Sequence, residues 1–170
     1  MSQPTWFERK FDFSFPAELL PNLCTRLRGT PARLEEVLRG CSHKILIGKP
    51  QEKWSAQEHA GHLLDLEPLW LSRVGDYMEG RYRLTEADLT NRKTHEANHN
   101  AHSLDQILTE FRAAREGLLK RVDELDALPL ARSIPHPRLK TPMRLVDHLY
   151  FVTEHDDHHL VQIWELVGPR

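Results

Sequence analysis

The chain has 170 residues, of which 39% are hydrophobic and 28% are charged, and this composition suits one domain with a hydrophobic core. The formal net charge of −2 gives no strong field of one sign, which argues against a nucleic-acid-binding or membrane-surface protein. The unusual feature is histidine, which occurs eleven times. We expect residues 1–170 to form a single domain.

Cysteine usage and hydropathy predict a cytoplasmic protein. The two cysteines, Cys24 and Cys41, lack the spacing of a disulfide framework, so we expect reduced thiols. The first ten residues lack the apolar core of a signal peptide. No apolar run approaches the ~18 residues that a membrane span needs, so we expect no membrane partner.

An aromatic segment opens the chain, and within residues 1–15 the side chains of Phe11, Phe13 and Phe15 alternate with other residues. This alternation predicts an extended segment with one face packed down. We expect the segment to seal one end of a helical bundle, with a contact to substrate as the alternative. It also motivates the prediction of a homodimer, although a bundle of this length could equally be self-sufficient.

Apolar residues at helical spacing predict four long helices, near residues 16–40, 55–79, 103–125 and 142–167. Gly29-Thr30-Pro31 interrupts the first pattern, which fits either one kinked helix or two short ones. Pro68 lies inside the second pattern and is expected to kink that helix. Four amphipathic helices without a strand signal predict an all-α four-helix bundle. The three linkers are too long for tight hairpins, which favours crossover connections.

The predicted helix ends rest on local capping signals. Capping boxes are expected at Ser55 with Glu58 and at Ser103 with Gln106. Thr141-Pro142 has the pattern of an N-cap followed by a proline at the first helical position. Gly168-Pro169 has the pattern of a helix stop.

Histidines on the last predicted helix have the spacing of metal ligands. His155 and His159 are one turn apart on one face, and that face also bears apolar residues, so the pair is expected to face the core. A buried imidazole without a partner is costly, and a metal ion would satisfy it. His62 is the best candidate for a third ligand, because it lies on the core face of the second helix, whereas His59 is rotated by about 60°. An all-imidazole set suits Zn, Ni, Cu or Fe better than Mg²⁺ or Ca²⁺, and we expect Zn²⁺ or Ni²⁺.

Two segments together resemble the DinB/YfiT-like superfamily. They are residues 54–63, Trp-Ser-Ala-Gln-Glu-His-Ala-Gly-His-Leu, and residues 155–163, His-Asp-Asp-His-His-Leu-Val-Gln-Ile. Residues 27–34 and 136–139 are also similar to one branch of that family. The resemblance implies a four-helix bundle of unusual connectivity with a divalent metal ion on His62, His155 and His159. It further implies a metal-dependent hydrolase or a thiol-dependent S-transferase acting on a small molecule, with a low-molecular-weight thiol as a partner.

Two other functions fit the same residues. A non-enzymatic metal-binding or stress-related bundle could use the histidines only for stability. The run from His155 to His159 also imitates the H-E-x-x-H motif of metalloproteases, with Asp156 at the position of the general base.

Other polar residues near these motifs have open roles. His95, His99 and His102 are spaced for a second metal site, but their polar surroundings favour a solvated loop or the start of a helix. His136 lies between prolines, either at the mouth of the site or in a rigid turn. His148 is expected to lie in the core or to contact a metal ligand from outside, and Gln162 to make an outer contact of the same kind. Glu58 lies one turn before His62 but is expected to cap the second helix.

Overall fold

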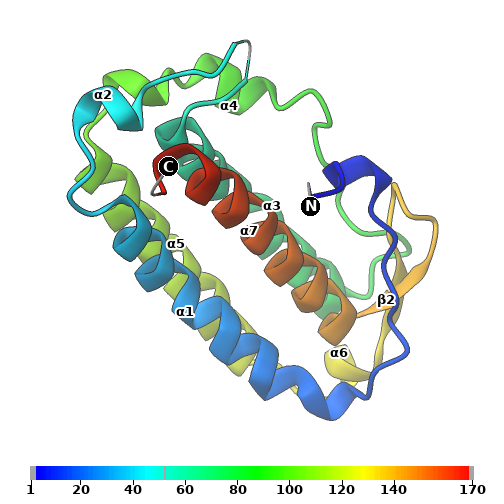
Figure 1. Ribbon diagram of the computed structural model, residues 1–170. Helices are drawn as coiled ribbons and strands as arrows, with labels where there is room; N and C mark the ends of the chain where they lie inside the picture. The colour runs from blue at the N-terminus through cyan, green and yellow to red at the C-terminus, as the bar shows by residue number, and fades with distance from the viewer. Residues whose placement is uncertain (1–2, 52, 169–170) are drawn as a thin grey trace.

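Four long helices run beside one another in the computed structural model, which describes residues 3–51 and 53–168 (Figure 1). They are α1 (Leu20–Leu38), α3 (Ala56–Glu79), α5 (Leu104–Asp123) and α7 (Leu145–Val167). The predicted all-α four-helix bundle is confirmed, and α1 is one continuous helix through Pro31. In the described part of the chain, no helix combines the length and the apolar character that crossing a membrane requires.

The order of the helices around the bundle differs from their order in the chain. Helix α1 packs against α5 and α7, and α3 packs against the same two helices. The consecutive long helices α1 and α3 therefore lie diagonally opposite each other (Figure 1). This arrangement confirms the crossover connections that the long linkers predict. The connections contain further short helices: α2 (His43–Leu46), α4 (Arg92–Glu96), η3 (His99–Ala101) and α6 (Ala127–Ala131).

The capping box at the start of α3 is confirmed, whereas the one predicted for α5 is wrong. The Ser55 hydroxyl accepts from the backbone N–H of Glu58, and the Glu58 carboxylate accepts from the backbone N–H of Ser55. Ser103 makes no such hydrogen bond. The Gln106 amide instead donates to the Glu110 carboxylate one turn further along the helix, at 2.8 Å, so it does not reach back to Ser103.

The predicted start of the last helix is also wrong, because Pro142–Arg144 forms strand β2 rather than the first helical turn. Strand β2 pairs in antiparallel fashion with β1 (Ser133–Pro135), with Ile134 opposite Met143. Both of these side chains are buried, so the pairing holds the chain extended until Arg144. Helix α7 then begins at Leu145, where the Asp147 carboxylate accepts from the backbone N–H of Arg144 at 2.8 Å.

The aromatic N-terminal segment lies along α7, as Figure 1 shows. It contains two short 3₁₀ turns, η1 (Trp6–Glu8) and η2 (Ala17–Leu19). The rings of Trp6 and Phe11 each lie 5.0 Å from the ring of Phe151, measured between centroids. The segment thus packs its rings on its own chain, and the homodimer stays a prediction.

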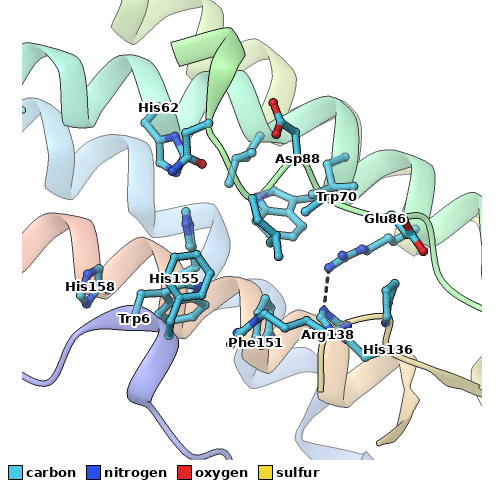
Figure 2. Close-up of a pocket in the computed structure, with 18 of the residues that line it drawn as sticks. Trp6, His62, Trp70, Glu86, Asp88, His136, Arg138, Phe151, His155 and His158 are labelled. Atoms are coloured by element: carbon cyan, nitrogen blue, oxygen red, sulfur yellow. Dashed lines mark hydrogen bonds between the residues drawn. The ribbon is translucent and has the colours of Figure 1, made fainter. Parts of the chain in front are cut away.

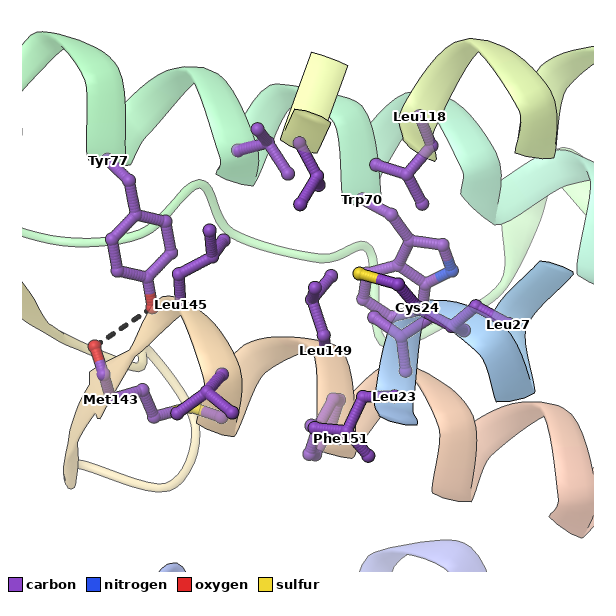
Figure 3. Close-up of a cluster of buried hydrophobic side chains, with 14 of the residues drawn as sticks. Leu23, Cys24, Leu27, Trp70, Tyr77, Leu118, Met143, Leu145, Leu149 and Phe151 are labelled. Carbon is purple, nitrogen blue, oxygen red and sulfur yellow. Dashed lines mark hydrogen bonds between the residues drawn. The ribbon is translucent and has the colours of Figure 1, made fainter. Parts of the chain in front are cut away.

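The hydrophobic core joins all four long helices (Figure 3). One buried cluster includes Leu27 of α1, Trp70 of α3, Leu118 of α5 and Leu149 of α7. The hydroxyl group of Tyr77 donates to the Met143 carbonyl at 2.9 Å, which fastens strand β2 to α3. A second cluster fills the other part of the bundle and contains Leu34, Leu63, Phe111 and Ile163. The cysteines Cys24 and Cys41 are both free thiols.

A buried charge cluster crosses the middle of this core. The guanidinium group of Arg115 on α5 is 1% exposed and lies between Glu67 of α3 and Asp156 of α7, with an N–O distance of 2.6 Å to each carboxylate. Arg115 also donates to the carbonyl of Leu27 on α1, and the Thr30 hydroxyl donates to Asp156 at 2.8 Å. The cluster therefore connects all four long helices through charge-assisted hydrogen bonds.

Replacing Arg115 with methionine should destabilise the fold by about 3–5 kcal/mol, because Glu67 and Asp156 would remain buried without a counter-charge. Arg112→Met is the matched control on the same helix, since the half-exposed Arg112–Glu35 ion pair should contribute at most about 1 kcal/mol. Urea denaturation of both variants measures the difference. Equal stability of the two variants would contradict the role given to Arg115.

Candidate metal centre

Three histidines from two helices converge at one point in the bundle. His62 of α3 and the pair His155 and His159 of α7 each offer a ring nitrogen, and these atoms all lie within 4.8 Å of one another. Figure 2 shows His62 pointing across the bundle towards His155. The three residues are 3%, 3% and 6% exposed. The structure thus brings together the three histidines that the sequence singles out.

The geometry and charge state of these rings fit a divalent ion. The Nε2 atoms of His155 and His159 are 3.2 Å apart, and two ligands of a tetrahedral Zn²⁺ ion are separated by about 3.3 Å. Burial lowers the pKa of His62 to about 3 and holds the pKa values of His155 and His159 well below their ordinary range. All three rings are therefore neutral at neutral pH, which is the state that binds a metal.

A hydrogen-bond chain fixes the orientation and tautomer of His62. The Thr94 hydroxyl donates to the Asp65 carboxylate at 2.9 Å, so its oxygen is free to accept from Nδ1–H of His62, also at 2.9 Å. The lone pair of His62 is then on Nε2. Second partners of this kind are the usual means by which proteins orient metal-binding histidines. Asp65 and Thr94 therefore belong to the site, although neither could ligate the ion in this arrangement.

A fourth histidine orients His159. The Nδ1 atoms of His59 and His159 are 2.9 Å apart. With the Nε2 lone pair of His159 facing the centre, its Nδ1 bears the hydrogen and donates to His59. His59 is thus outside the group of three converging histidines but in contact with one of them, His159. No sequence pattern indicated this contact.

The histidines of this connection occupy different environments: His95 and His99 lie in the short helices α4 and η3, and solvent exposure is wrong for His99 alone. His99 is buried, and its Nε2 lies 2.8 Å from Oδ2 of Asp65, the same oxygen that accepts from the Thr94 hydroxyl. His95 and His102 are exposed. Among the described residues these three histidines do not converge as metal ligands, which argues against a second metal site here.

The three histidines lie at the wall of a cavity of about 400 Å³. This volume falls in the range of small-molecule sites, and most of the wall is apolar. The N-terminal segment contributes Trp6 and Phe7, so the predicted alternative of a substrate contact fits their position. The residues that line the cavity around the histidines and along its wall include Trp54, Leu66, Trp70, Phe151 and His158.

The other residues with open roles are now placed. His136 lines the cavity, whereas His148 is fully buried outside it, near the rings of Trp70 and Tyr77. Glu58 caps α3 and pairs with Lys49, so it is not directed at the centre. The Gln162 amide donates to Gln3 at 3.4 Å.

Substituting Gly61 should test the packing of His99 behind the centre. A Cβ atom at Gly61 would lie 2.2 Å from the His99 ring, so Gly61→Ala should destabilise the protein by about 1–3 kcal/mol. Gly75→Ala is the control on the same helix, because a Cβ atom there meets nothing within 4 Å and should stabilise α3 by up to about 1 kcal/mol. Thermal unfolding with a chelator present gives both values. A stabilising Gly61→Ala would mean that His99 is not held in this position.

Comparisons with known proteins add the family. Among curated proteins none matches this chain. Its structure is similar to that of YfiT from Bacillus subtilis, a probable metal-dependent hydrolase with an unusual four-helix bundle topology, with a TM-score of 0.79 and 18% identity over 94% of this chain and 91% of that one. It is also similar to a mycothiol-dependent maleylpyruvate isomerase, with a TM-score of 0.68 and 12% identity over 91% of this chain and 61% of that one. A sequence model of the DinB superfamily matches residues 26–163, a stretch that contains all three converging histidines, and the chain therefore belongs to the DinB superfamily.

Proposed function

We propose that the protein is a metal-dependent enzyme that activates a nucleophile, either water or a low-molecular-weight thiol, for attack on a small molecule. His62, His155 and His159 hold one divalent ion, Zn²⁺ or Ni²⁺. The observation that supports this most directly is the convergence of three neutral imidazoles at the wall of a cavity. Three protein ligands facing an open space are the usual arrangement of a catalytic zinc site.

The bound ion would lower the pKa of a coordinated water or thiol and polarise a carbonyl group. The chain's own residues orient the histidine rings and limit the access of water. Thr94 and His59 hold the rings of His62 and His159 in the tautomers that point Nε2 at the centre. Trp54 lies over His62 with ring centroids 4.7 Å apart, so its indole limits the access of bulk water to the ligands. A dry, rigid surrounding strengthens electrostatic interactions at the reacting atoms.

The cavity favours an enzyme over a bundle in which the metal only adds stability. A structural zinc site is closed by four protein ligands. Here the described residues supply three, and all three of them line the cavity, which would leave room for a further ligand. The two structurally similar proteins, one described as a probable metal-dependent hydrolase and the other as mycothiol-dependent, support water and thiol respectively as the activated nucleophile.

The metalloprotease alternative does not fit the position of Asp156. That mechanism would need the Asp156 carboxylate beside the metal as a general base. Asp156 is fully buried instead, and both of its oxygens accept from Arg115. The residue that imitates the protease motif in the sequence is therefore part of the bundle's charge cluster.

Removing a ligand should remove the metal. His155→Ala and His159→Ala should each abolish stoichiometric Zn²⁺ or Ni²⁺ binding, because two imidazoles hold such an ion poorly. His95→Ala is the control, since His95 is an exposed histidine outside the cluster. Elemental analysis of the purified variants, with circular dichroism to verify folding, decides the matter. Full occupancy in His155→Ala, or its loss in His95→Ala, would place the metal on other residues.

Breaking the chain behind His62 should weaken metal binding without removing a ligand. Thr94→Val has nearly the same shape but cannot accept from Nδ1–H of His62, so the affinity for Zn²⁺ should fall by about tenfold to a hundredfold. Thr109→Val on the exposed face of α5 should leave it unchanged. Competition with a chromophoric chelator measures both constants. An unchanged affinity in Thr94→Val would show that Thr94 does not orient the ligand.

A further inference from the structure

The cavity has a second polar end, formed by basic side chains. Arg73 of α3 and, from the turn between β1 and β2, Arg138 and Lys140 line the cavity together with His136. Figure 2 shows His136 and Arg138 at the end of the cavity away from His62. Among residues 3–51 and 53–168, no carboxylate lies within ion-pair distance of these three cations. The ion pairs of the described chain involve other basic residues.

Hydrogen-bond donors surround His136 on both sides of its ring. Its Nδ1 faces the backbone N–H groups of Arg138 and Leu139, each at 3.2 Å, and its Nε2 faces Nη1 of Arg73 at 3.1 Å. Burial, with Arg73 as the next cause, lowers the pKa of His136 to about 3, so the ring is neutral and bears one N–H. In either tautomer that N–H points at another donor. This end of the cavity therefore has more donors than acceptors.

The two arginines add unmatched charge to this donor excess. Nη2 of Arg138 is buried without a hydrogen-bond partner in the described chain. The side chain of Arg138 lies over the rings of Phe7 and Phe151, at 5.3 Å and 5.8 Å from their centroids. Arg73 is 1% exposed, and its Nε donates to the Thr85 carbonyl. Arg138 is only partly buried, but its Nη2 is buried, and buried charged groups without counter-ions are costly. An anion in the cavity would relieve that cost.

We infer that Arg73, His136 and Arg138 bind the carboxylate of the substrate, so that the substrate is a monoanionic carboxylic acid with an apolar body. The inference rests on the proposed function in taking the molecule that fills this cavity to be the substrate. Planar carboxylates match the donor geometry of arginine. A carboxylate oxygen of the substrate would also accept from Nη1 of Arg73, which in this structure faces Nε2 of His136.

At the arginine end of the cavity, the charges of the lining favour a ligand with one negative charge over a ligand with two. Glu86 and Asp88 also line the cavity, so with three cations the lining has one net positive charge. Neither carboxylate satisfies the arginines, because Glu86 pairs with Arg83 and Asp88 accepts from Thr90 and from the backbone of Arg92. At this end of the cavity, away from the converging histidines, the carboxylates of Glu86 and Asp88 would repel a dianion such as a phosphate monoester more than a monoanion.

Aromatic rings connect the two polar ends. The ring of Phe151 lies 5.1 Å from that of His136 and 6.2 Å from that of Trp70, and Trp70 lies 5.6 Å from His155, all between centroids. An apolar body in contact with Phe151 and Trp70 would thus extend from the carboxylate site towards the converging histidines. The reacting group of the substrate lies at that other end.

The test uses three probes on the metal-loaded protein: cyclohexylacetate, its neutral analogue cyclohexylacetamide, and cyclohexyl phosphate. Binding is followed by tryptophan fluorescence, since Trp6 and Trp70 line the cavity. Cyclohexylacetate should bind at least about tenfold more tightly than the amide and, after the metal is removed with a chelator, more tightly than the phosphate. Arg138→Met should reduce its affinity by about tenfold or more, and Arg138→Lys, which keeps the charge, by less. The control Arg121→Met, at an exposed ion pair on α5, should not change it.

Repeating the titration after treatment with a chelator separates this inference from the proposed metal site. Binding of cyclohexylacetate that still depends on Arg138 without metal supports the carboxylate site, even if elemental analysis finds no bound metal and the proposed function fails. Binding that disappears with the metal and does not depend on Arg138 means that the carboxylate only ligates the ion, and overturns it. Equal affinity for the amide, or tighter binding of the phosphate by the chelator-treated protein, also overturns it.

Discussion

The arrangement of the bundle depends on the guanidinium group of Arg115, which is buried between Glu67 and Asp156. Removing these charges from water is expensive, and only the near-complete hydrogen bonding of the cluster offsets that cost. Because its members come from all four long helices, the cluster sets the position of each helix relative to the others. Asp156 directly follows His155 in α7, so the same hydrogen bonds that fix Asp156 in the core fix where His155 points.

The buried polar groups of the charge cluster have hydrogen-bond partners, whereas several of those around the cavity do not. In the charge cluster nearly every donor has an acceptor, as buried polar groups usually do. Among the described residues, the buried side-chain nitrogens without partners belong to four residues, and three of these line the cavity: Arg138, His155 and His158. The fourth is His148, in the adjacent core. Buried polar groups without partners are rare in proteins, so their concentration around one cavity indicates a binding site.

The sequence predicts what helical periodicity determines and misses what the connections determine. The i, i+4 spacing of His155 and His159 and the core face of His62 follow from the geometry of single helices. The capping box of Ser55 was predictable for the same reason, since it involves only one turn. The contacts of Thr94, His99 and His136 depend on how the connections between the long helices fold back over them. Strand β2 was missed because Pro142 fits the start of a helix equally well in isolation, and only its pairing with β1 excludes that start.

The crossover topology and the site depend on each other. A bundle with short hairpin loops would leave the ends of its helices without additional chain to cover them. Here each long connection brings a side chain to the cavity or behind its ligands: Trp54 before α3, Thr94 before α5, and Arg138 before α7. The helices provide the converging histidines, and the connections provide the tautomer of His62 and the charge at the far end of the cavity. Substitutions in the connections of such a bundle can therefore change which molecule binds in the cavity, while the histidines keep their positions on the helices.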